Sequence, residues 1–353
     1  MPEKEADRRM EFKVAELDEK LAYLAFGYSK SVNQLAYADC VMFENGRAYT
    51  FSGGTLASVA LDFGFEGVVN YADFAQHIRT LTYDDPDTLI EIYAEEHAFV
   101  IKRGRSLTRF PFAPIVPVSL ETLGLPDPAS WHSVPDGFKQ AIKKCEAIFT
   151  RQVTSDSILS CLHVTGTCVE AATPEQVIRV KCDMDVPFPF LVKFGRLGKL
   201  FGAKFPDPVD YQVTDKWLFF RNFDVVFGIP HSRDSFVSID RFFVVEGDEV
   251  CFPDATSMDL HLFQSFYTQG SGSGVRLAFG GDTCSLSIKT KRGQHSVSFP
   301  LKCPENEVYI VTPALLRILA HYGKCTFNGN CVHVKTNTVD YTASVTREGE
   351  YAL

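Results

Sequence analysis

Two patterns of apolar residues alternate along the chain, and they do so in the same order three times. Apolar residues spaced three to four apart predict amphipathic helices over residues 16–28, 73–81, 136–152, 190–204, 257–268 and 313–322. Short runs of alternating apolar and polar residues predict three strands after each helix. The chain therefore reads as a unit of helix, three strands, helix and three strands that occurs three times.

The predicted strands are short, as strands of antiparallel sheets usually are. They cover residues 35–37, 40–43, 48–51, 89–93, 99–102, 107–110, 158–161, 168–171, 177–180, 210–213, 217–220, 225–227, 275–277, 285–288, 296–299, 325–327, 332–334 and 341–345. Together with the helices they predict an α+β fold. A true internal repeat is one interpretation; the other is that any α+β chain can be cut into similar thirds.

Boundaries between the repeats differ in clarity. The stretch 113–135 contains five prolines and marks the first boundary, since proline interrupts regular structure. The second boundary, near Phe242 and Phe243, is much less distinct. We expect three domains, at residues 1–114, 115–242 and 243–353.

The composition is that of an ordinary globular protein, with 45% hydrophobic and 22% charged residues. It excludes a collagen-like fibre and a disordered chain. The first nine residues are polar and charged, unlike a secretory signal, and no apolar run approaches the roughly 18 residues of a membrane span. We therefore expect a cytoplasmic protein with no membrane association. The ten cysteines form no CxxC pair, which predicts reduced, mostly buried thiols.

Positive charge is concentrated on the predicted helices. For this count, the second helix is taken as residues 72–81 and the last as residues 313–324. The six helical segments then carry a net charge of +5. Because the whole chain carries −9, the residues outside the helices carry −14. Helical spacing places the basic residues on faces opposite the apolar ones: Lys139, Lys143, Lys144 and Arg151; Lys193, Arg196, Lys199 and Lys204; Arg317, His321 and Lys324. Such faces attract phosphates without reading bases. The alternative for any one helix is an ordinary solvated cationic face.

No catalytic motif competes with this interpretation. The chain has no GxGxxG opening a helix, no P-loop and no HExxH. The glycine-rich stretch 270–274 leads into a strand and reads as a turn. Cys325, Cys331 and His333 lack a fourth ligand for a metal. We expect no enzyme, no cofactor and no metal; the alternative is a β-rich enzyme whose site is assembled from distant residues.

Several short segments resemble the bacterial DNA polymerase sliding clamp, the β subunit of DNA polymerase III. They are Met10-Glu-Phe-Lys-Val14, Val100-Ile-Lys-Arg-Gly-Arg-Ser106 and Gly274-Val-Arg-Leu277, together with the threefold order and the length. The resemblance implies three tandem clamp repeats, with helices inside and antiparallel sheets outside a ring. It also implies a homodimer around duplex DNA, a DNA polymerase and an ATP-dependent clamp loader as partners, and no cofactor. The alternative is a clamp-like scaffold that binds proteins but does not encircle DNA.

The resemblance also assigns site residues. Lys30 occupies the place of a DNA-contacting basic residue in the loop after the first helix. The implied dimer contact joins Leu107 and Phe110 to Phe266 and Tyr267, and the implied partner-peptide cleft uses Leu159, Thr173, Val177, Ile178 and Leu353. The family commonly has Thr-Asp-Gly-His/Tyr-Arg-Leu where this chain has Thr173-Pro-Glu-Gln-Val-Ile178. Loss of the Gly and Arg implies an altered partner motif and suits a phage-encoded or otherwise divergent member.

Overall fold

Ten elements recur three times in one order: strand, helix, four strands, helix, three strands. The computed structural model describes residues 9–30, 37–114, 122–124, 126–149, 158–202, 204–269, 274–291, 293–302 and 307–348. Contacts divide the chain into two compact units, the first made of Met1–Val134 and Gly195–Ser232 and the second of Pro135–Phe194 and Arg233–Leu353. This division cuts through the middle repeat, and the three domain boundaries remain a prediction.

The first repeat comprises β1 (Met10–Lys13), α1 (Val14–Leu24), β2 (Cys40–Glu44), β3 (Arg47–Phe51), β4 (Leu56–Ala60), β5 (Gly67–Asn70), α2 (Tyr71–Asp84), β6 (Leu89–Glu95), β7 (Ala98–Arg103) and β8 (Ser106–Pro111). The second comprises β9 (His132–Ser133), α3 (Phe138–Glu146), β10 (Cys161–Val164), β11 (Cys168–Ala172), β12 (Gln176–Lys181), β13 (Phe190–Lys193), α4 (Phe194–Leu200), β14 (Asp210–Val213), β15 (Trp217–Asn222) and β16 (Val225–Ser232).

The third repeat comprises β17 (Asp248–Cys251), α5 (Leu260–Gln269), β18 (Val275–Gly280), β19 (Thr283–Thr290), β20 (Gly293–Pro300), β21 (Val308–Val311), α6 (Pro313–Tyr322), β22 (Lys324–Asn328), β23 (Cys331–Lys335) and β24 (Val339–Ser344). A short strand β25 (Thr346–Arg347) follows, and two 3-10 turns, η1 (Ile158–Ser160) and η2 (Asp240–Phe243), lie between elements.

All strand pairs within the units are antiparallel. The first unit has one sheet in the order β1-β6-β7-β8 and another in the order β9-β14-β15-β16-β4-β3-β2-β5. The second unit has the orders β17-β22-β23-β24-β12-β11-β10-β13 and β20-β19-β18-β21-β25. The α+β prediction is confirmed.

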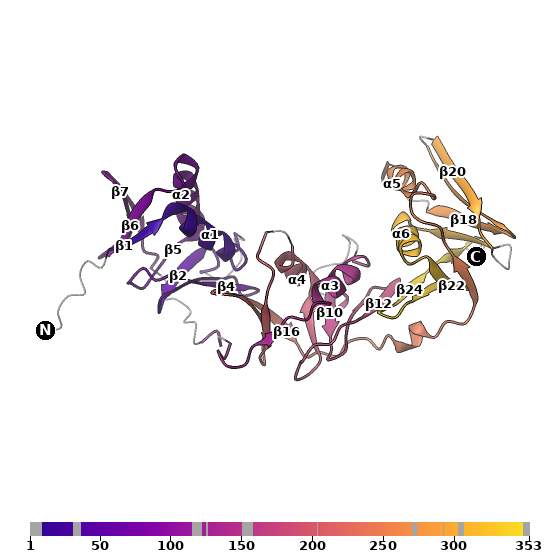
Figure 1. Cartoon of the computed structure of the whole chain (residues 1–353), viewed down its shortest axis with the longest axis horizontal. Coiled ribbons are helices and arrows are strands. Elements are labelled where there is room, and N and C mark those ends of the chain that lie inside the picture. Colours follow the sequence, from indigo (N-terminus) through magenta and orange to yellow (C-terminus); the bar gives the residue numbers. More distant parts are fainter. Residues whose placement is uncertain are drawn as a thin grey trace. The chain divides into compact units, whose positions relative to one another are not determined.

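Helices pack in pairs on these sheets. In the first unit α1 lies against α2, and in the second α5 lies against α6 (Figure 1). Local sequence fixes where α6 begins: the Thr312 hydroxyl accepts from the backbone N–H of Leu315 at 3.2 Å, and Pro313 fills the first position, where its missing N–H costs no hydrogen bond. The helix stops before Gly323, whose φ of 73° favours glycine.

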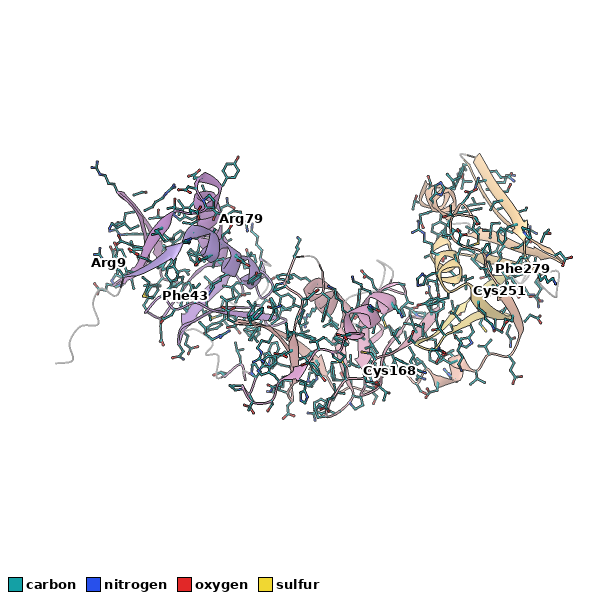
Figure 2. All side chains as sticks on the ribbon, viewed as in Figure 1. Arg9, Phe43, Arg79, Cys168, Cys251 and Phe279 are labelled. Carbon is teal, nitrogen blue, oxygen red and sulfur yellow. The ribbon has the colours of Figure 1, made fainter. Side chains whose placement is uncertain are left out.

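Aromatic side chains fill the core of the first repeat. Phe43 stacks on Phe99 with ring centroids 5.8 Å apart and meets Phe63 edge to face at 4.8 Å, and Figure 2 marks its position beneath the helices. The third repeat places Phe279 against Phe327 at 5.3 Å in the same way. Buried aromatic rings of this size bury a large apolar area, and this burial stabilises the packing of the helices on the sheets in each repeat.

The structure corrects several sequence predictions. Residues 190–193 form strand β13 rather than the first turn of a helix, because Phe190, Leu191 and Val192 pair with β10 and are buried. Lys193 therefore ends a strand, and α4 is only seven residues long. Strands β1, β5, β13 and β21, each directly before a helix, were not expected; a short apolar run that continues into a helix has no clear period of its own.

Some predictions concern residues that lie partly or wholly outside the described part of the chain. Helix α3 ends at Glu146, short of the expected 152, and Arg151 lies outside the described residues, as do Leu353 and the glycine-rich residues 270–273. Of the strand expected at 35–37, only Tyr37 is described, and it lies in a turn. All nine described cysteines are free thiols, and one of them, Cys251, is exposed. Among the described residues, no helix has the length and apolar character needed to cross a membrane.

Candidate nucleic-acid and peptide-binding surfaces

Helix α3 presents its basic residues on the side away from the sheet. Its apolar face, Phe138, Ala141, Ile142 and Cys145, is buried against β11 and β12. Lys143 is exposed, while Lys139 and Lys144 are half-buried, with Lys144 Nζ 3.5 Å from Thr338 Oγ1. This is the arrangement that the sequence predicted for this helix.

The basic residues of α4 make contacts inside the first unit. The guanidinium of Arg196 lies over Gly54 so closely that a Cβ at position 54 would come within 2.5 Å of its Nη2. Lys199 Nζ lies 3.4 Å from the carbonyl oxygen of Ala25 and 5.2 Å from the ring centre of Phe26. Burial lowers the pKa of Lys199, and the nearby Lys204 adds to the effect. Lys199 therefore interacts with the C-terminal end of α1.

The basic stripe predicted on α6 is only partly on the helix. Arg317 and His321 are exposed on α6, but Lys324 begins β22 and forms an ion pair with Glu249 at 2.7 Å. A hydrogen bond to Glu249 raises the pKa of Lys324. Lys30, in the loop after α1, is exposed.

Helix α1 differs from α3 and α6 in the sign of its charge. Its exposed or half-exposed side chains include Glu16, Asp18 and Glu19. Positive charge on the helices is thus concentrated on α3, α4 and α6 rather than shared by all six.

The residues implied as a dimer contact lie on or beside the edges of two sheets. Leu107 is 40% exposed on β8, which in the described chain has a neighbouring strand on one side only. Phe110, on the same strand, packs against Phe74 at 5.9 Å. Phe266 and Tyr267 are half-buried on α5, and the Phe266 ring lies parallel to that of His295 on β20, 6.1 Å away. Strand β20 is likewise an edge strand among the residues described.

An apolar groove of about 480 Å³ opens on one face of β11, β12 and β24. Leu159, Thr173 and Val177, three residues of the implied peptide cleft, line it. Ile178 does not: neighbouring residues of a strand point to opposite faces, and Ile178 is buried among other core residues. The Thr173 hydroxyl accepts from the backbone N–H of Gln176 at 3.0 Å, forming a tight turn at the groove rim.

The opposite wall of the groove comes from a segment that the sequence analysis treated only as an indistinct boundary. We call residues 236–245 the linker. Its groove-lining side chains are apolar or basic: Val237, Ile239, Arg241, Phe242, Val244 and Val245. Val244 is 79% and Val237 44% exposed. Large apolar residues are dense around the expected second boundary, and this was the signal available, since exposed apolar groups collect at interaction sites.

The similar solved structures share one fold. No protein-family model matches the chain, and no curated protein sequence is similar to it. A putative DNA polymerase III β subunit from Eubacterium rectale superposes with a TM-score of 0.77 at 10% identity, covering 96% of this chain and 99% of that one. The chain has the sliding-clamp fold. The prediction of a clamp fold is thereby confirmed.

Two further solved structures support this assignment. Caulobacter crescentus pol III β gives a TM-score of 0.77 at 13% identity, over 96% of this chain and all of that one. The Helicobacter pylori β clamp bound to a DNA ligase peptide gives 0.72 at 11% identity, over 96% and 99%. At 10–13% identity, the likeness is one of fold.

Proposed function

We propose that the chain is a DNA sliding clamp that encircles duplex DNA as a ring-shaped homodimer and tethers a replicative DNA polymerase without catalysing a reaction. The observation that carries the proposal is the threefold order of elements, which matches DNA polymerase III β subunits over 96% of the chain. Processivity then comes from topology, because a closed ring leaves circular DNA only by opening.

The size of such a ring suits duplex DNA. Two chains of three repeats supply twelve helices, and helices pack about 8–10 Å apart, which gives a ring roughly 31–38 Å across at the helix axes. Subtracting about 10 Å for the helices themselves leaves a hole of about 21–28 Å. Duplex DNA about 20 Å wide would pass through it.

Phosphate contacts would come from the basic residues described above. Lys30, Lys139, Lys143, Lys144, Arg151, Lys193, Arg196, Lys199, Arg317, His321 and Lys324 are the candidates. Two of them also have partners within the protein: Lys199 contacts the carbonyl oxygen of Ala25, and Lys324 pairs with the carboxylate of Glu249. Contacts to phosphates carry no sequence information and so permit sliding.

Two of the edge strands, β8 and β20, supply the proposed contact between protomers. Pairing β8 of one chain with β20 of the other would join Leu107 and Phe110 to Phe266 and Tyr267 of the second copy. An edge strand left unpaired exposes backbone donors and acceptors that another strand can satisfy. A head-to-tail contact that closes after two copies would give the ring.

The apolar groove is the proposed site for a partner's peptide. The related fold from Helicobacter pylori is described with a DNA ligase peptide bound, and this chain's groove is lined by aliphatic side chains that suit leucine and phenylalanine. We propose that the polymerase and an ATP-dependent clamp loader use it. The changed segment from Thr173 to Ile178 implies a partner motif different from the common one.

A trapping assay tests encirclement without a loader. Linear duplex is fixed to a bead at one end, the protein is allowed to thread over the free end, and streptavidin then blocks that end. We expect protein to survive a wash of about 0.5 M salt, which screens phosphate contacts, and to be released when a restriction enzyme cuts off the block. Equal loss from blocked and open DNA would overturn the proposal and favour a protein-binding scaffold.

A variant tests the basic surface in the same assay. Neutralising Lys139, Lys143, Lys193 and Arg196 together should weaken capture at low salt while the dimer mass stays unchanged. Normal capture by this variant would remove these four residues from the DNA surface but leave the topological proposal standing.

A further inference from the structure

A second, larger pocket lies on the other side of the linker from the apolar groove. It has a volume of about 960 Å³, and its lining includes charged and polar side chains of β10, β11 and β12. Val237 and Ile239 of the linker line both this pocket and the groove. The linker is therefore a shared wall, and whatever holds it in the pocket also sets the shape of the groove.

A buried carboxylate organises the pocket. Glu170 on β11 is only 5% exposed and lies between its register partners on the neighbouring strands, His163 on β10 and Arg179 on β12. Its Oε2 is 2.7 Å from His163 Nδ1 and its Oε1 accepts from Arg179 Nε at 2.5 Å. Both carboxylate oxygens are thus occupied, as a buried charge requires.

Arg179 uses its other end to hold the linker. Its Nη2 donates to Asp240 Oδ1 at 2.6 Å, and its guanidinium lies over the ring of Phe243 at 5.0 Å. Because the Nε is already fixed by Glu170, the guanidinium is oriented before it meets Asp240. Fixing the planar fork in this way gives a directional contact that a lysine could not make.

Three further contacts seat the linker on the sheet. Phe236 stacks on the His163 ring at 4.8 Å, the carbonyl oxygen of Phe242 accepts from the Thr342 hydroxyl at 2.7 Å, and Ile239 is 2% exposed beside Ala172 and Val177. The polar network and the apolar floor of the groove lie on the same face of β11 and β12, since Glu170 and Ala172, like Arg179 and Val177, are two residues apart.

We infer that Arg179 and Asp240, oriented by Glu170 and His163, are positioning residues for partner binding: their ion pair holds the linker as one wall of the groove, so peptide affinity depends on groups outside the groove lining. This inference rests on the proposed use of the groove. Asp240 is largely exposed, with 75% of its side chain accessible, so its ion pair adds little to global stability. Its loss should release the linker while the fold remains.

The first test combines hydrogen exchange and peptide binding on the full chain. Asp240→Asn keeps the shape of the side chain and removes the charge. We expect faster exchange confined to residues 236–245, unchanged thermal unfolding, and about 3- to 10-fold weaker binding of a fluorescein-labelled hexapeptide carrying adjacent Leu and Phe. Asp248→Asn, an equally conservative change at an exposed position of β17, is the matched control and should alter none of these.

A double-mutant cycle tests whether Asp240 acts through Arg179. Arg179→Met and Asp240→Asn should not be additive, because either change alone breaks the ion pair. Asp240→Glu, which keeps the charge, should restore part of the affinity. Additive losses, or no rescue by the glutamate, would overturn the positioning role.

A groove variant separates failure of this inference from failure of the proposed function. Val244 lines the groove and is exposed, so Val244→Asp should abolish peptide binding without unfolding the chain. If the unaltered chain does not bind the peptide, or if Val244→Asp does not weaken its binding, the groove does not take this Leu-Phe peptide and the proposed use of the groove loses this support. If Val244→Asp abolishes binding but Asp240→Asn changes neither affinity nor linker exchange, the inference alone falls.

Discussion

Lys199 directs its amine at the end of a helix: Nζ lies 3.4 Å from the carbonyl oxygen of Ala25, the residue that follows α1. Charge counting along the sequence assigned this lysine to DNA together with its neighbours. In the structure it also meets the negative end of the α1 dipole and the face of Phe26. A basic residue on a helix can thus serve the fold as well as a ligand.

Replacing Lys199 should therefore cost stability. We expect Lys199→Met to lower the free energy of unfolding by at most about 1 kcal/mol, because a cation near a helix C-terminus contributes about 0.3–1 kcal/mol and the burial that lowers the pKa of this amine offsets part of that gain. Urea unfolding measures the change. Lys143→Met, on the exposed side of α3, is the control and should stay within about 0.5 kcal/mol of the unaltered chain. Equal effects of the two substitutions would show that the contact with α1 contributes nothing.

The proposed ring contact can be broken from the surface. Leu107→Asp places a charge on exposed edge strand β8 and should yield monomers by light scattering, since a buried unpaired charge at an interface is strongly unfavourable. Leu89→Asp, at a 57% exposed position on β6 of the same sheet, should leave the mass unchanged. A Leu107→Asp dimer would remove β8 from the interface. Phe266→Ala is a less selective test, because Phe266 also packs on His295.

The buried carboxylate at the linker predicts a specific acid sensitivity. Although burial opposes ionisation, the hydrogen bonds from His163 and Arg179 hold the pKa of Glu170 below its ordinary value of 4.5. A depressed folded-state pKa stabilises the fold fully above the unfolded value, and this contribution is lost as the pH falls through the folded value. We expect Glu170→Gln to cost about 1–2 kcal/mol at pH 7 and progressively less below pH 4.5. Urea unfolding at pH 7, 5, 4 and 3 measures this difference, and a constant difference would contradict it.

Sequence reasoning succeeded where local chemistry fixes an element. The predicted helix 313–322 coincides with α6, because Thr312, Pro313 and Gly323 mark both of its ends. It failed where an apolar run is compatible with either a strand or a helix. Residues Phe190–Lys193 are such a run: they form a strand, and helix α4 follows directly. No local signal distinguishes these cases, since the choice depends on pairing with distant β10.

The candidate sites were predictable to a similar degree. Val177 lines the groove and Ile178 does not, because neighbouring residues of strand β12 point to opposite faces of the sheet. Which of the two faces the groove is known only once the pairing of β12 with β24 is known. The linker wall and the Glu170 network were missed, because His163, Glu170 and Arg179 lie on three successive strands and form no motif, and Asp240 follows Arg179 by 61 residues. The pairing of β10, β11 and β12 brings the first three together, and packing of the linker on these strands brings Asp240 to Arg179.

The unpaired edges of strands β8 and β20, in the part of the chain that the structure describes, have a consequence for handling the protein. Strand β20 carries small and polar residues at Gly293, Ser296 and Ser298, so side-chain fit alone specifies its alignment with a second strand weakly. A diluted protomer would leave main-chain amides and carbonyls along both rims bonded only to solvent. Thermal tolerance should then rise with protein concentration, and crowded refolding would favour misaligned, fibre-like stacking over closure.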